Sequence, residues 1–571
     1  MRTVYQYIRP KLSRIGLTMV IKIGGTVIEL YLPWLLSSIL DDCAAVGDLQ
    51  GAWLRGGLMV LCSLLALAGN AIANYMSCAT SRDITRRLRS DLYHKTMHLS
   101  CAQVDHFTVP SLMSRINSDI YNVHQMIDRM QRLGVRAPML LLGGILVALT
   151  LEPVLSLVLI ATLPLLGITM VYASRHGVRL YEASQQSLDR LVRKVQENMT
   201  GARVIKALSK TDWERRRFDE ISRDNMQREA KAANTMALTG PVMNFLLSAG
   251  LAVVIWVGAV RVQYGLTQPG KIIAFLSYFT IILNALLMIS RIFTFYSKGA
   301  ASARRVEEVL TAPVELTPVP APVQKDQSAI RFRDVRFSYN KVHTDLGPLN
   351  FAVQPGGTLG IIGPTGSGKT TVLSLLQRFY DPDEGEILLS GVPLRSLDND
   401  ALRSRIGVVL QSDFLMADTI DANIRFGREI SADSVHQAAR TAQADFILQK
   451  EDGFDAMLTS RGSNLSGGQK QRLLIARALA GNPQILLLDD CSSALDYKTD
   501  ADLRRALKQR KGLSATVIVA QRVTAVRDCD QILVLDQGQQ VGLGSHEELM
   551  RTCPMYRELY HLQVGEEVEA V

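Results

Sequence analysis

The most chemically informative stretch of the sequence is a glycine-rich loop that follows a short apolar run. The run covers residues 359–362, and the loop has the Gly-x4-Gly-Lys-Thr pattern of a phosphate-binding P-loop. Its glycines allow backbone N–H groups to converge on phosphate, and a following helix adds the positive end of its dipole. The expected nucleotide-binding residues are Gly363, Pro364, Thr365, Gly366, Ser367, Gly368, Lys369, Thr370 and Thr371.

Two residues of this loop have distinct expected roles, and a carboxylate farther along the chain completes the set. Lys369 supplies a positive charge for the β- and γ-phosphates, and Thr370 supplies a hydroxyl ligand for Mg²⁺. Residues 485–489 form an apolar run that ends in Asp489, which is typical of a buried strand with a carboxylate that holds Mg²⁺ through water. The sequence therefore predicts binding of ATP together with Mg²⁺.

A pentapeptide between these two motifs separates one class of P-loop ATPase from the rest. It reads Leu-Ser-Gly-Gly-Gln and precedes a segment rich in alanine and leucine. With this signature pentapeptide, the chain resembles an ABC transporter, specifically an exporter half-transporter in which six membrane helices precede one nucleotide-binding domain. The resemblance implies that the pentapeptide faces ATP bound to a partner's P-loop, and its residues here are Leu465, Ser466, Gly467, Gly468 and Gln469.

The resemblance also assigns positions outside these motifs. Tyr339 lies where the family stacks an aromatic ring on adenine, and Gln411 matches the glutamine that contacts Mg²⁺ and senses the membrane domain. Ser493–Asp496 matches the D-loop, whose Asp496 is expected to face the partner's ATP. Segments 105–119 and 202–218 are similar to the two intracellular loops whose tips couple to the nucleotide domains.

Two positions depart from the family pattern, and both belong to the chain's own ATP site. The residue after Asp489 is normally a glutamate that polarises the attacking water, but here it is Asp490. Aspartate is shorter by about 1.5 Å, and such a misplacement can cost on the order of 100-fold in rate. Gln521 replaces the switch histidine, so it donates a hydrogen bond but carries no positive charge. The expected catalytic positions of this site are Asp490, Gln521 and Gln411. The two departures among them predict a site that binds ATP and hydrolyses it poorly.

An intact signature pentapeptide beside a weakened catalytic pair resembles one subunit of a heterodimeric multidrug exporter with asymmetric sites. Residues 465–469 would then complete the competent site on the P-loop of a second half-transporter. The expected function is ATP-driven efflux of small hydrophobic or amphipathic compounds by alternating access. The alternatives are a homodimeric lipid or peptide exporter and an ATP-gated channel or regulatory subunit.

The elements that must position these motifs form two predicted domains. The chain has 571 residues, 47% of them hydrophobic, and its mean hydropathy of +0.11 is too high for a wholly soluble protein. The apolar residues gather in six N-terminal segments of about 20 residues, long enough to cross a bilayer. The predicted spans are residues 16–40, 56–79, 135–151, 154–173, 241–260 and 272–290.

The predicted fold is an α-helical membrane domain with long cytoplasmic extensions, followed by an α/β P-loop ATPase domain. The membrane domain covers residues 1–309, and the nucleotide-binding domain covers residues 330–571. Residues 310–329 are rich in proline and valine, which favours an extended linker between the two. Seven scattered cysteines without a Cys-x-x-Cys pair make a disulfide framework or zinc site an unfavoured interpretation.

The distribution of charge predicts how the chain lies in the membrane. The net charge is +9, and basic residues concentrate in stretches 80–134 and 174–240, whereas the first interhelical loop contains three aspartates. By the positive-inside rule, both termini and the nucleotide domain are expected to be cytoplasmic. The expected location of the protein is a bacterial inner or plasma membrane. The basic excess therefore orients the protein in a lipid bilayer and requires no nucleic-acid partner.

Two ionisable residues fall within the first predicted span. Lys22 and Glu29 are about two helical turns apart on nearly one face. Because ionised groups in hydrocarbon are costly, each is expected to face a partner or a water-filled cavity. Structural pairing, or placement of Lys22 near the inner membrane surface, is the favoured interpretation, and contact with substrate is the alternative.

Overall fold

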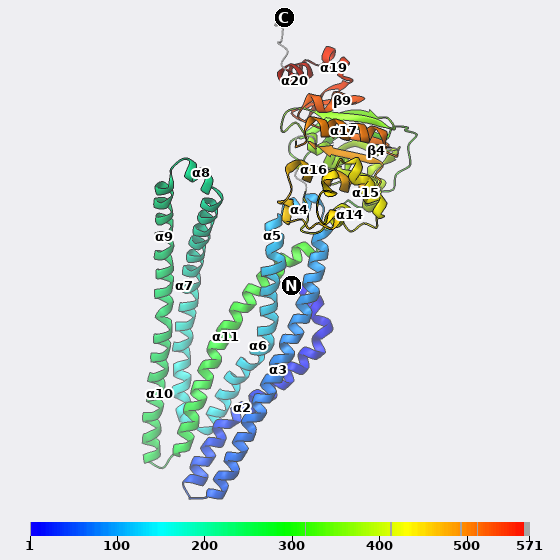
Figure 1. Cartoon of the computed structure of the whole chain (residues 1–571). Coiled ribbons are helices and arrows are strands. Elements are labelled where there is room, and N and C mark those ends of the chain that lie inside the picture. The colour runs from blue at the N-terminus through cyan, green and yellow to red at the C-terminus, as the bar shows by residue number, and fades with distance from the viewer. Residues whose placement is uncertain (1, 315, 412–413, 492–493, 511, 565–571) are drawn as a thin grey trace. The chain divides into compact units, whose positions relative to one another are not determined.

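Figure 1 shows a computed structural model that describes residues 2–314, 316–411, 414–491, 494–510 and 512–564. The chain divides into two compact units. The first consists of Met1–Lys95 with Met113–Thr311, and the second consists of Thr96–Leu112 with Ala312–Val571. Residues 96–112 lie between the second and third predicted spans in the sequence but belong structurally to the C-terminal unit.

The first unit is built from long helices. Six of its helical segments are long and apolar enough to cross a membrane, counted over the described residues, and each contains one predicted span. The prediction of six membrane helices is therefore confirmed. The helices that belong to this unit wholly or in part are α1 (Arg2–Ile8), α2 (Leu12–Ser38), α3 (Leu49–Met97), α5 (Val109–Ser114), α6 (Ile120–Leu151), α7 (Pro153–Thr200), α8 (Ala202–Ala207), α9 (Thr211–Ala237), α10 (Thr239–Gln263) and α11 (Pro269–Leu310).

These helices are much longer than a bilayer is thick. α3 has 49 residues and α7 has 48, so at 1.5 Å per residue each is about 70 Å long. A hydrocarbon core of about 30 Å accommodates fewer than half of these residues. The basic stretches are therefore helical extensions of membrane helices rather than separate soluble insertions.

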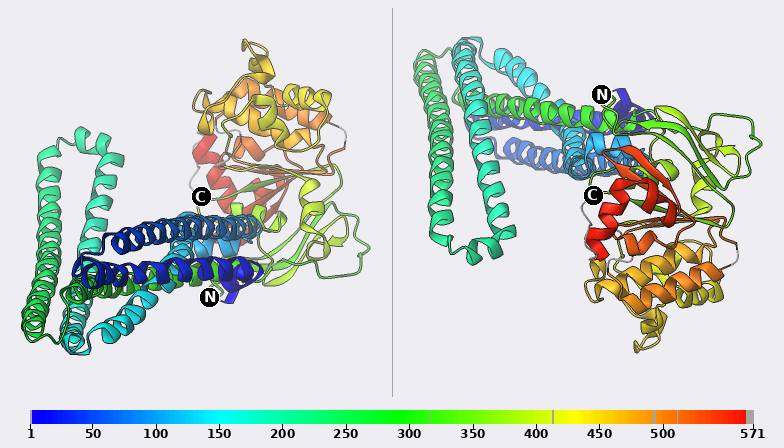
Figure 2. Two further views of the ribbon diagram at one scale, coloured as in Figure 1. Left: turned by 90° about the horizontal axis from the view of Figure 1, so that it is seen from below. Right: turned by 90° about the horizontal axis from the view of Figure 1, so that it is seen from above.

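The core of the first unit lies between α2, α6 and α11, with part of α7 and α10. Phe275, Tyr278 and Phe279 of α11 are fully buried, and the Tyr278 hydroxyl donates a hydrogen bond to the Leu30 carbonyl at 2.6 Å. In Figures 1 and 2, α7, α8 and α9 form an arm that stands apart from the other helices of this unit. Trp256 on α10 is 70% exposed, so apolar surface remains for lipid or a partner subunit.

The second unit contains two β-sheets. One is antiparallel with the order β2-β1-β4-β5, and the other has the order β10-β9-β3-β8-β7-β6 and is parallel except for β10. The strands are β1 (Ile330–Phe337), β2 (Leu346–Val353), β3 (Gly357–Ile362), β4 (Glu384–Leu389), β5 (Val392–Pro393), β6 (Ile406–Val409), β7 (Ile485–Asp489), β8 (Ala515–Val519), β9 (Gln531–Asp536) and β10 (Gln539–Gly544).

Short helices surround these sheets, and the described residues of 311–329 that precede them form neither helix nor strand. The α/β architecture agrees with the prediction. The helices are α4 (Cys101–Phe107), α12 (Lys369–Leu376), α13 (Asn399–Ser404), α14 (Ile420–Arg425), α15 (Ala432–Thr441), α16 (Gly467–Ala480), α17 (Tyr497–Gln509), α18 (Val523–Val526), α19 (His546–Thr552) and α20 (Pro554–Val564).

The order of the parallel strands explains why distant motifs meet. β3 leads into the P-loop, β7 ends at Asp489, and Gln521 follows β8. β6 lies beside β7 and is followed by Gln411. Because parallel strands end at the same edge of a sheet, these four segments converge there.

Candidate functional site

The P-loop connects β3 to α12 through glycines in unusual backbone conformations. Gly366 and Gly368 have φ angles of 84° and 94°, in the left-handed region that glycine adopts without steric cost. A side chain at Gly368 would also meet the Leu346 Cδ1 atom at 2.7 Å. Because α12 begins at Lys369, the N–H groups of its first turn are available to an anion.

Two polar side chains are buried within this loop. Lys369 is 9% exposed, and its Nζ donates hydrogen bonds to the carbonyl oxygens of Gly363 and Pro364 at 2.8 and 2.7 Å. Burial lowers the pKa of Lys369, while two nearby carboxylates oppose that shift. The Ser367 hydroxyl is buried and has no hydrogen-bond partner within the described part of the chain. Such a hydroxyl fits a loop whose bonding is completed by phosphate oxygens.

The carboxylate at the end of β7 faces the start of α12. Asp489 is 3% exposed, and its Oδ2 accepts a hydrogen bond from the Thr370 hydroxyl at 3.3 Å. Burial raises the pKa of Asp489, and the hydrogen bond from Thr370 opposes the shift. A hydroxyl beside a carboxylate fits Mg²⁺, which usually takes one or two carboxylates and completes its octahedron with water and phosphate.

A cavity of about 300 Å³ joins these groups. Gly363, Pro364 and Ser367 belong to the same loop but do not line the cavity. The other residues predicted for the chain's own ATP site all lie on its wall: Tyr339, Thr365, Gly366, Gly368, Lys369, Thr370, Thr371, Gln411, Asp489, Asp490 and Gln521. Five separate stretches of sequence therefore meet at one place.

Tyr339 is an exposed aromatic side chain of this cavity. It is 51% exposed, and its hydroxyl donates a hydrogen bond to Thr371 Oγ1 at 3.1 Å. Its ring packs edge-on against Phe337 and Tyr380, with centroids 4.8 and 5.2 Å away. Asp345 also lines the cavity, and its Oδ2 accepts a hydrogen bond from the Tyr339 N–H at 2.8 Å. No sequence signal marks Asp345, because its irregular neighbourhood resembles any surface loop.

The two departures from the family pattern lie on the wall of the same cavity. Asp490 has a φ of 50°, which is uncommon for a residue with a side chain, and its N–H donates to the Val519 carbonyl at 2.8 Å. Burial raises the pKa of Asp490, while the charges of Arg522 and Lys369 oppose the shift. Gln521 follows β8 directly after Ala520 and shares the cavity wall with Asp490.

The signature pentapeptide is absent from the described wall of this cavity. Instead, it forms the N-terminus of α16. The Ser466 hydroxyl accepts a hydrogen bond from the Gln469 N–H at 3.3 Å, and the Ser466 N–H donates to Gln469 Oε1 at 3.0 Å. This reciprocal pair is a capping box, which fixes the start of the helix. A side chain at Gly468 would meet the Ala494 carbonyl oxygen at 3.0 Å, so the loop is closely packed there.

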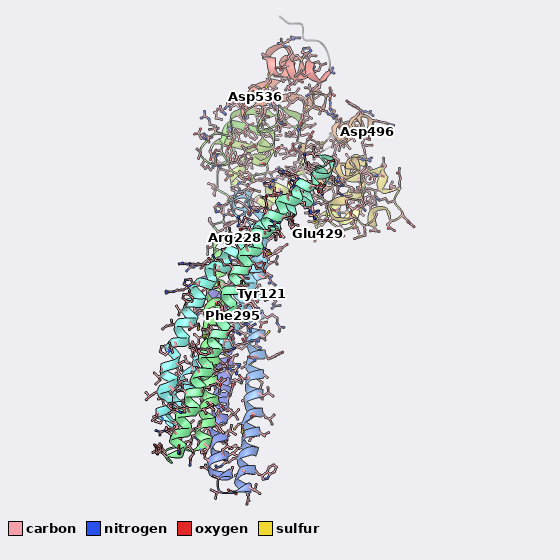
Figure 3. All side chains as sticks on the ribbon, turned by 90° about the vertical axis from the view of Figure 1, so that its left-hand side faces the viewer. Tyr121, Arg228, Phe295, Glu429, Asp496 and Asp536 are labelled. Carbon is pink, nitrogen blue, oxygen red and sulfur yellow. The ribbon has the colours of Figure 1, made fainter. Side chains whose placement is uncertain are left out.

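Asp496, labelled in Figure 3, caps a second helix. It is likewise missing from the described cavity wall. Its Oδ1 accepts a hydrogen bond from the Thr499 N–H at 2.9 Å, at the start of α17. The bonds from Thr499 lower the pKa of Asp496. Ser493, at the start of the matched D-loop, lies outside the described residues. A role for Asp496 at a partner's ATP stays a prediction.

The matched intracellular loop at 105–119 contributes a helix to the second unit. Asp105 on α4 accepts a hydrogen bond from the Tyr380 hydroxyl at 2.5 Å. Burial raises the pKa of Tyr380, and the bond to Asp105 adds to the shift. Because the Tyr380 ring also touches Tyr339, α4 is two side chains away from the expected adenine position. The other matched loop, 202–218, forms α8 and the start of α9 in the first unit.

The ionisable residues of the first span do not pair with each other. Glu29 accepts two hydrogen bonds from Arg136 Nη2, at 2.7 and 3.0 Å. Lys22 is 2% exposed, and its Nζ donates a hydrogen bond to Asn74 Oδ1 at 3.0 Å. Structural partners therefore exist for both residues, and they connect α2 to α6 and α3. Arg136 lies in the third predicted span, where a search for apolar length alone does not distinguish it.

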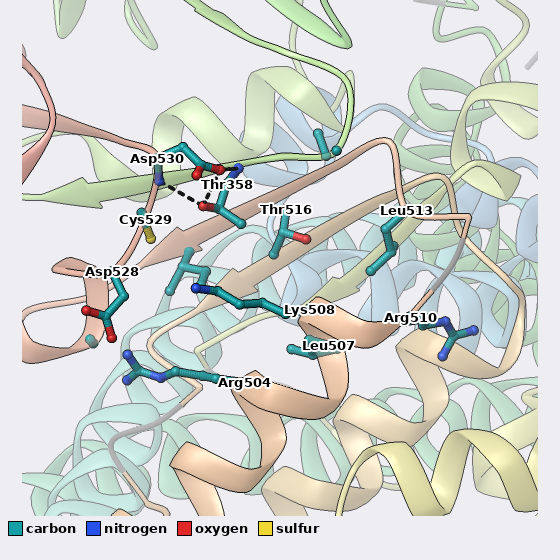
Figure 4. A pocket seen from close by; sticks show the side chains of 14 residues that line it. Thr358, Arg504, Leu507, Lys508, Arg510, Leu513, Thr516, Asp528, Cys529 and Asp530 are labelled. Atoms are coloured by element: carbon teal, nitrogen blue, oxygen red, sulfur yellow. Dashed lines mark hydrogen bonds between the residues drawn. The ribbon is translucent and has the colours of Figure 1, made fainter.

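A second, larger cavity has a different location. It has a volume of about 440 Å³ and lies at the amino ends of β3 and β8, the sheet edge opposite the P-loop (Figure 4). Its lining includes Arg504, Lys508 and Arg510, with apolar Leu507 and Leu513. Among the described residues, none predicted for the ATP site lines it. The convergence of motifs, and not size, therefore marks the 300 Å³ cavity as the candidate functional site.

Both halves of the chain match known families. Residues 15–286 match the family described as "ABC transporter transmembrane region". Residues 346–493 match the family described as "ABC transporter". The chain is 32% identical over 570 residues to the uncharacterised ABC transporter ATP-binding protein YfiB of Bacillus subtilis (strain 168), covering 99% of each chain.

Two further relatives connect the chain to export. An ATP-dependent lipid A-core flippase of Methylococcus capsulatus is 30% identical, with 90% of this chain and 86% of the flippase covered. The solved structure of a bacterial Atm1-family ABC exporter with ATP bound superimposes with a TM-score of 0.79 at 25% identity. That match covers 98% of this chain and 99% of the exporter. The predicted fold, six membrane helices before an α/β nucleotide domain, is thereby confirmed.

Proposed function

Since the chain belongs to the ABC transporter family, as an exporter half-transporter, we propose that it is one subunit of a heterodimeric exporter. It is an integral membrane protein with an ATP-binding domain. In the proposed function, a second half-transporter completes the machine, which expels small hydrophobic or amphipathic compounds by alternating access. The chain's own ATP site binds nucleotide and hydrolyses it slowly.

One observation carries the proposal of asymmetric sites. Asp490 and Gln521 share a cavity wall with most of the predicted nucleotide-binding residues, including Lys369 and Asp489. Binding groups are therefore retained where both groups that act on the attacking water and the γ-phosphate are altered. A shorter carboxylate loses the position needed to polarise water, and a neutral amide loses the charge that stabilises the transition state.

The Mg²⁺ part of the proposal rests on the donor set around α12. Thr370 and Asp489 would hold the ion, with Gln411 on the same cavity wall. When bound there, Mg²⁺ supplies positive charge that offsets the developing charge on phosphate. In this proposal Lys369 binds the β- and γ-phosphates, and the ring of Tyr339, which is 51% exposed, stacks on adenine. This division of roles leaves hydrolysis to Asp490 and Gln521.

Coupling between nucleotide and membrane helices would use α4. The hydrogen bond from Tyr380 to Asp105, together with the ring contact between Tyr380 and Tyr339, links the adenine position to a segment between two membrane helices. If nucleotide binding changes the position of Tyr339, Tyr380 would therefore transmit that change to Asp105 on α4. In the proposed cycle this contact helps convert closure of the nucleotide domains into outward opening of the helices.

The test compares the chain alone with the chain joined to a candidate partner half-transporter, both purified and reconstituted in lipid vesicles. We expect slow ATP hydrolysis by the chain alone, and rapid hydrolysis with ATP-dependent accumulation of a fluorescent amphipathic dye in the mixed complex. Rapid hydrolysis by the chain alone, at the rate of the mixed complex, would contradict the asymmetric sites. A mixed complex that hydrolyses ATP but moves no amphipathic compound would contradict the substrate class.

The resemblance to the lipid A-core flippase supports a second candidate function, lipid export by a homodimer. The same vesicles distinguish it when they contain a fluorescent phospholipid and a membrane-impermeant quencher. ATP-dependent movement of the lipid by the chain alone would favour the homodimeric lipid exporter. Dye transport that requires the partner would favour the heterodimer.

A further inference from the structure

The last turn of α20 is hydrogen-bonded to the segment that carries Gln521. Gln563 Oε1 accepts a hydrogen bond from the Val523 N–H at 2.7 Å. The same side-chain amide donates through Nε2 to the Gln521 carbonyl oxygen at 2.9 Å. One side chain therefore contacts two backbone positions in this part of the chain, Gln521 in the turn after β8 and Val523 at the start of α18.

α20 presents Gln563 from a well-anchored helix. Tyr556 on α20 is fully buried, and its hydroxyl lies 2.9 Å from His546 Nδ1 on α19. Tyr556 belongs to an apolar cluster that includes Val526 of α18 and Ile532 of β9. The Gln563 side chain is itself exposed, so its contacts with the turn position the backbone there but add little to the core.

The turn is also anchored on its sheet side. The Ala520 N–H donates a hydrogen bond to the Ile361 carbonyl of β3 at 3.1 Å, next to the P-loop strand. Gln521 comes next, with its carbonyl held by Gln563 and its side chain on the wall of the ATP cavity. A neutral glutamine has no charge to draw it to phosphate, so its placement depends strongly on the backbone that carries it.

We propose that Gln563 is a positioning residue for the chain's own ATP site. By holding the Gln521 carbonyl, it fixes the direction in which the Gln521 side chain leaves the backbone and keeps it facing the γ-phosphate. The C-terminal helix thereby sets how long the site retains ATP. This inference rests on the proposed function, in which the chain's own site binds nucleotide and hydrolyses it slowly.

Three variants of the full chain, each in complex with its partner, separate the contacts. Gln563→Met removes both hydrogen bonds at similar side-chain length. Gln563→Glu keeps an acceptor for the Val523 N–H but replaces the donor to the Gln521 carbonyl with a carboxylate oxygen. Leu562→Ala, at a 73% exposed residue of the same turn, is the matched control. Melting temperatures establish that all three complexes are folded.

The measurement is the release of radiolabelled 8-azido-ATP with Mg²⁺, crosslinked to this chain at intervals after a chase with unlabelled ATP. We expect release about 2- to 10-fold faster in both Gln563 variants, the effect of losing one hydrogen bond, and unchanged release in Leu562→Ala. Wild-type release in Gln563→Glu would overturn the proposal, because it would show that the bond to the Gln521 carbonyl does not control retention.

A double-mutant cycle with Gln521→Ala distinguishes positioning from general support of the domain. If Gln563 acts through the Gln521 side chain, Gln563→Met has no further effect on release in the Gln521→Ala background. An equal effect in both backgrounds would overturn the positioning role. The wild-type complex provides the separate check: rapid hydrolysis at this chain's own site contradicts the proposed function, whereas slow hydrolysis with identical release in all variants contradicts only the role of Gln563.

Discussion

The nucleotide domain has two regions matched to ATP chemistry, and they differ in how closely they follow the family pattern. The cavity beside the P-loop contains Lys369 and Asp489, which are predicted to bind phosphate and Mg²⁺, but it has Asp490 and Gln521 where the family pattern has glutamate and histidine. At the start of α16 the pentapeptide is unaltered, and Ser466 and Gln469 form a complete capping box. In the proposed function the two regions differ in the same way, because the cavity retains ATP and α16 completes the ATP site of a partner.

The variant with the largest expected effect alters the signature pentapeptide at the start of α16. In Gly468→Asp, the new Cβ atom would lie only 3.0 Å from the Ala494 carbonyl oxygen, and the carboxylate would bring negative charge to a helix end expected to face phosphate. We expect ATP hydrolysis by the complex to fall on the order of 100-fold, as when an anion-stabilising group is removed from a transition state. Steady-state phosphate release from the purified complex measures it.

The matched control for that prediction is Asp490→Asn, which alters the cavity side. With a slow own site, this change leaves steady-state hydrolysis by the complex nearly unaltered. Equal loss in Gly468→Asp and Asp490→Asn would show that both sites contribute alike, and the proposed asymmetry would be wrong.

The second prediction repairs the cavity instead of damaging α16. In the double variant Asp490→Glu with Gln521→His, the carboxylate regains its length and the switch position regains a side chain that can carry positive charge. We expect single-turnover hydrolysis at this chain's own site to rise by about 10- to 100-fold. Quenched-flow analysis of ATP bound to this chain measures the rate.

The single variants show which replacement limits the site. Asp490→Glu alone gains less than the pair if Gln521 also limits hydrolysis. No gain in the double variant would indicate that the site is slow for reasons outside these two side chains.

The comparison also shows what can be read from sequence. The six spans, the P-loop and the buried strand ending in Asp489 are local patterns, so their existence could be predicted without coordinates. Their convergence follows from the order of the parallel strands, which the family resemblance implies. Tyr380 could not be predicted, because it acquires its role from a contact with Asp105, which is distant in sequence. Asp345 bonds to the nearby Tyr339 N–H, but it lies in an irregular loop that has no pattern to mark it. Arg136 could not be predicted either, because it lies within an apolar span and acquires its role from its contact with Glu29 on another helix.

A third, smaller effect concerns the link between the cavity and α4. Tyr380→Phe keeps the ring against Tyr339 but loses the hydrogen bond to Asp105. Because a hydrogen bond to a carboxylate is worth more than a neutral one, we expect a several-fold loss of transport per ATP hydrolysed. ATP binding should change little. Tyr497→Phe, at an 82% exposed tyrosine, is the control, and equal losses in both variants would contradict a role for the link.

The smallest expected effect is a stability change that follows from the buried carboxylate of the cavity. Burial raises the pKa of Asp489, so the folded protein holds that proton to higher pH than the unfolded chain does. The contribution of Asp489 to the free energy of unfolding is therefore greatest below its ordinary pKa and falls as the pH rises through the raised value.

Asp489→Asn cannot ionise and escapes this loss. Without nucleotide and Mg²⁺, we expect its melting temperature to exceed that of wild type at pH 7.5. The excess should shrink towards pH 4.5. An excess that stays constant with pH would show that ionisation of Asp489 does not cause the difference in melting temperature. The difference would then have to come from another feature of the cavity, such as the left-handed backbone of Asp490.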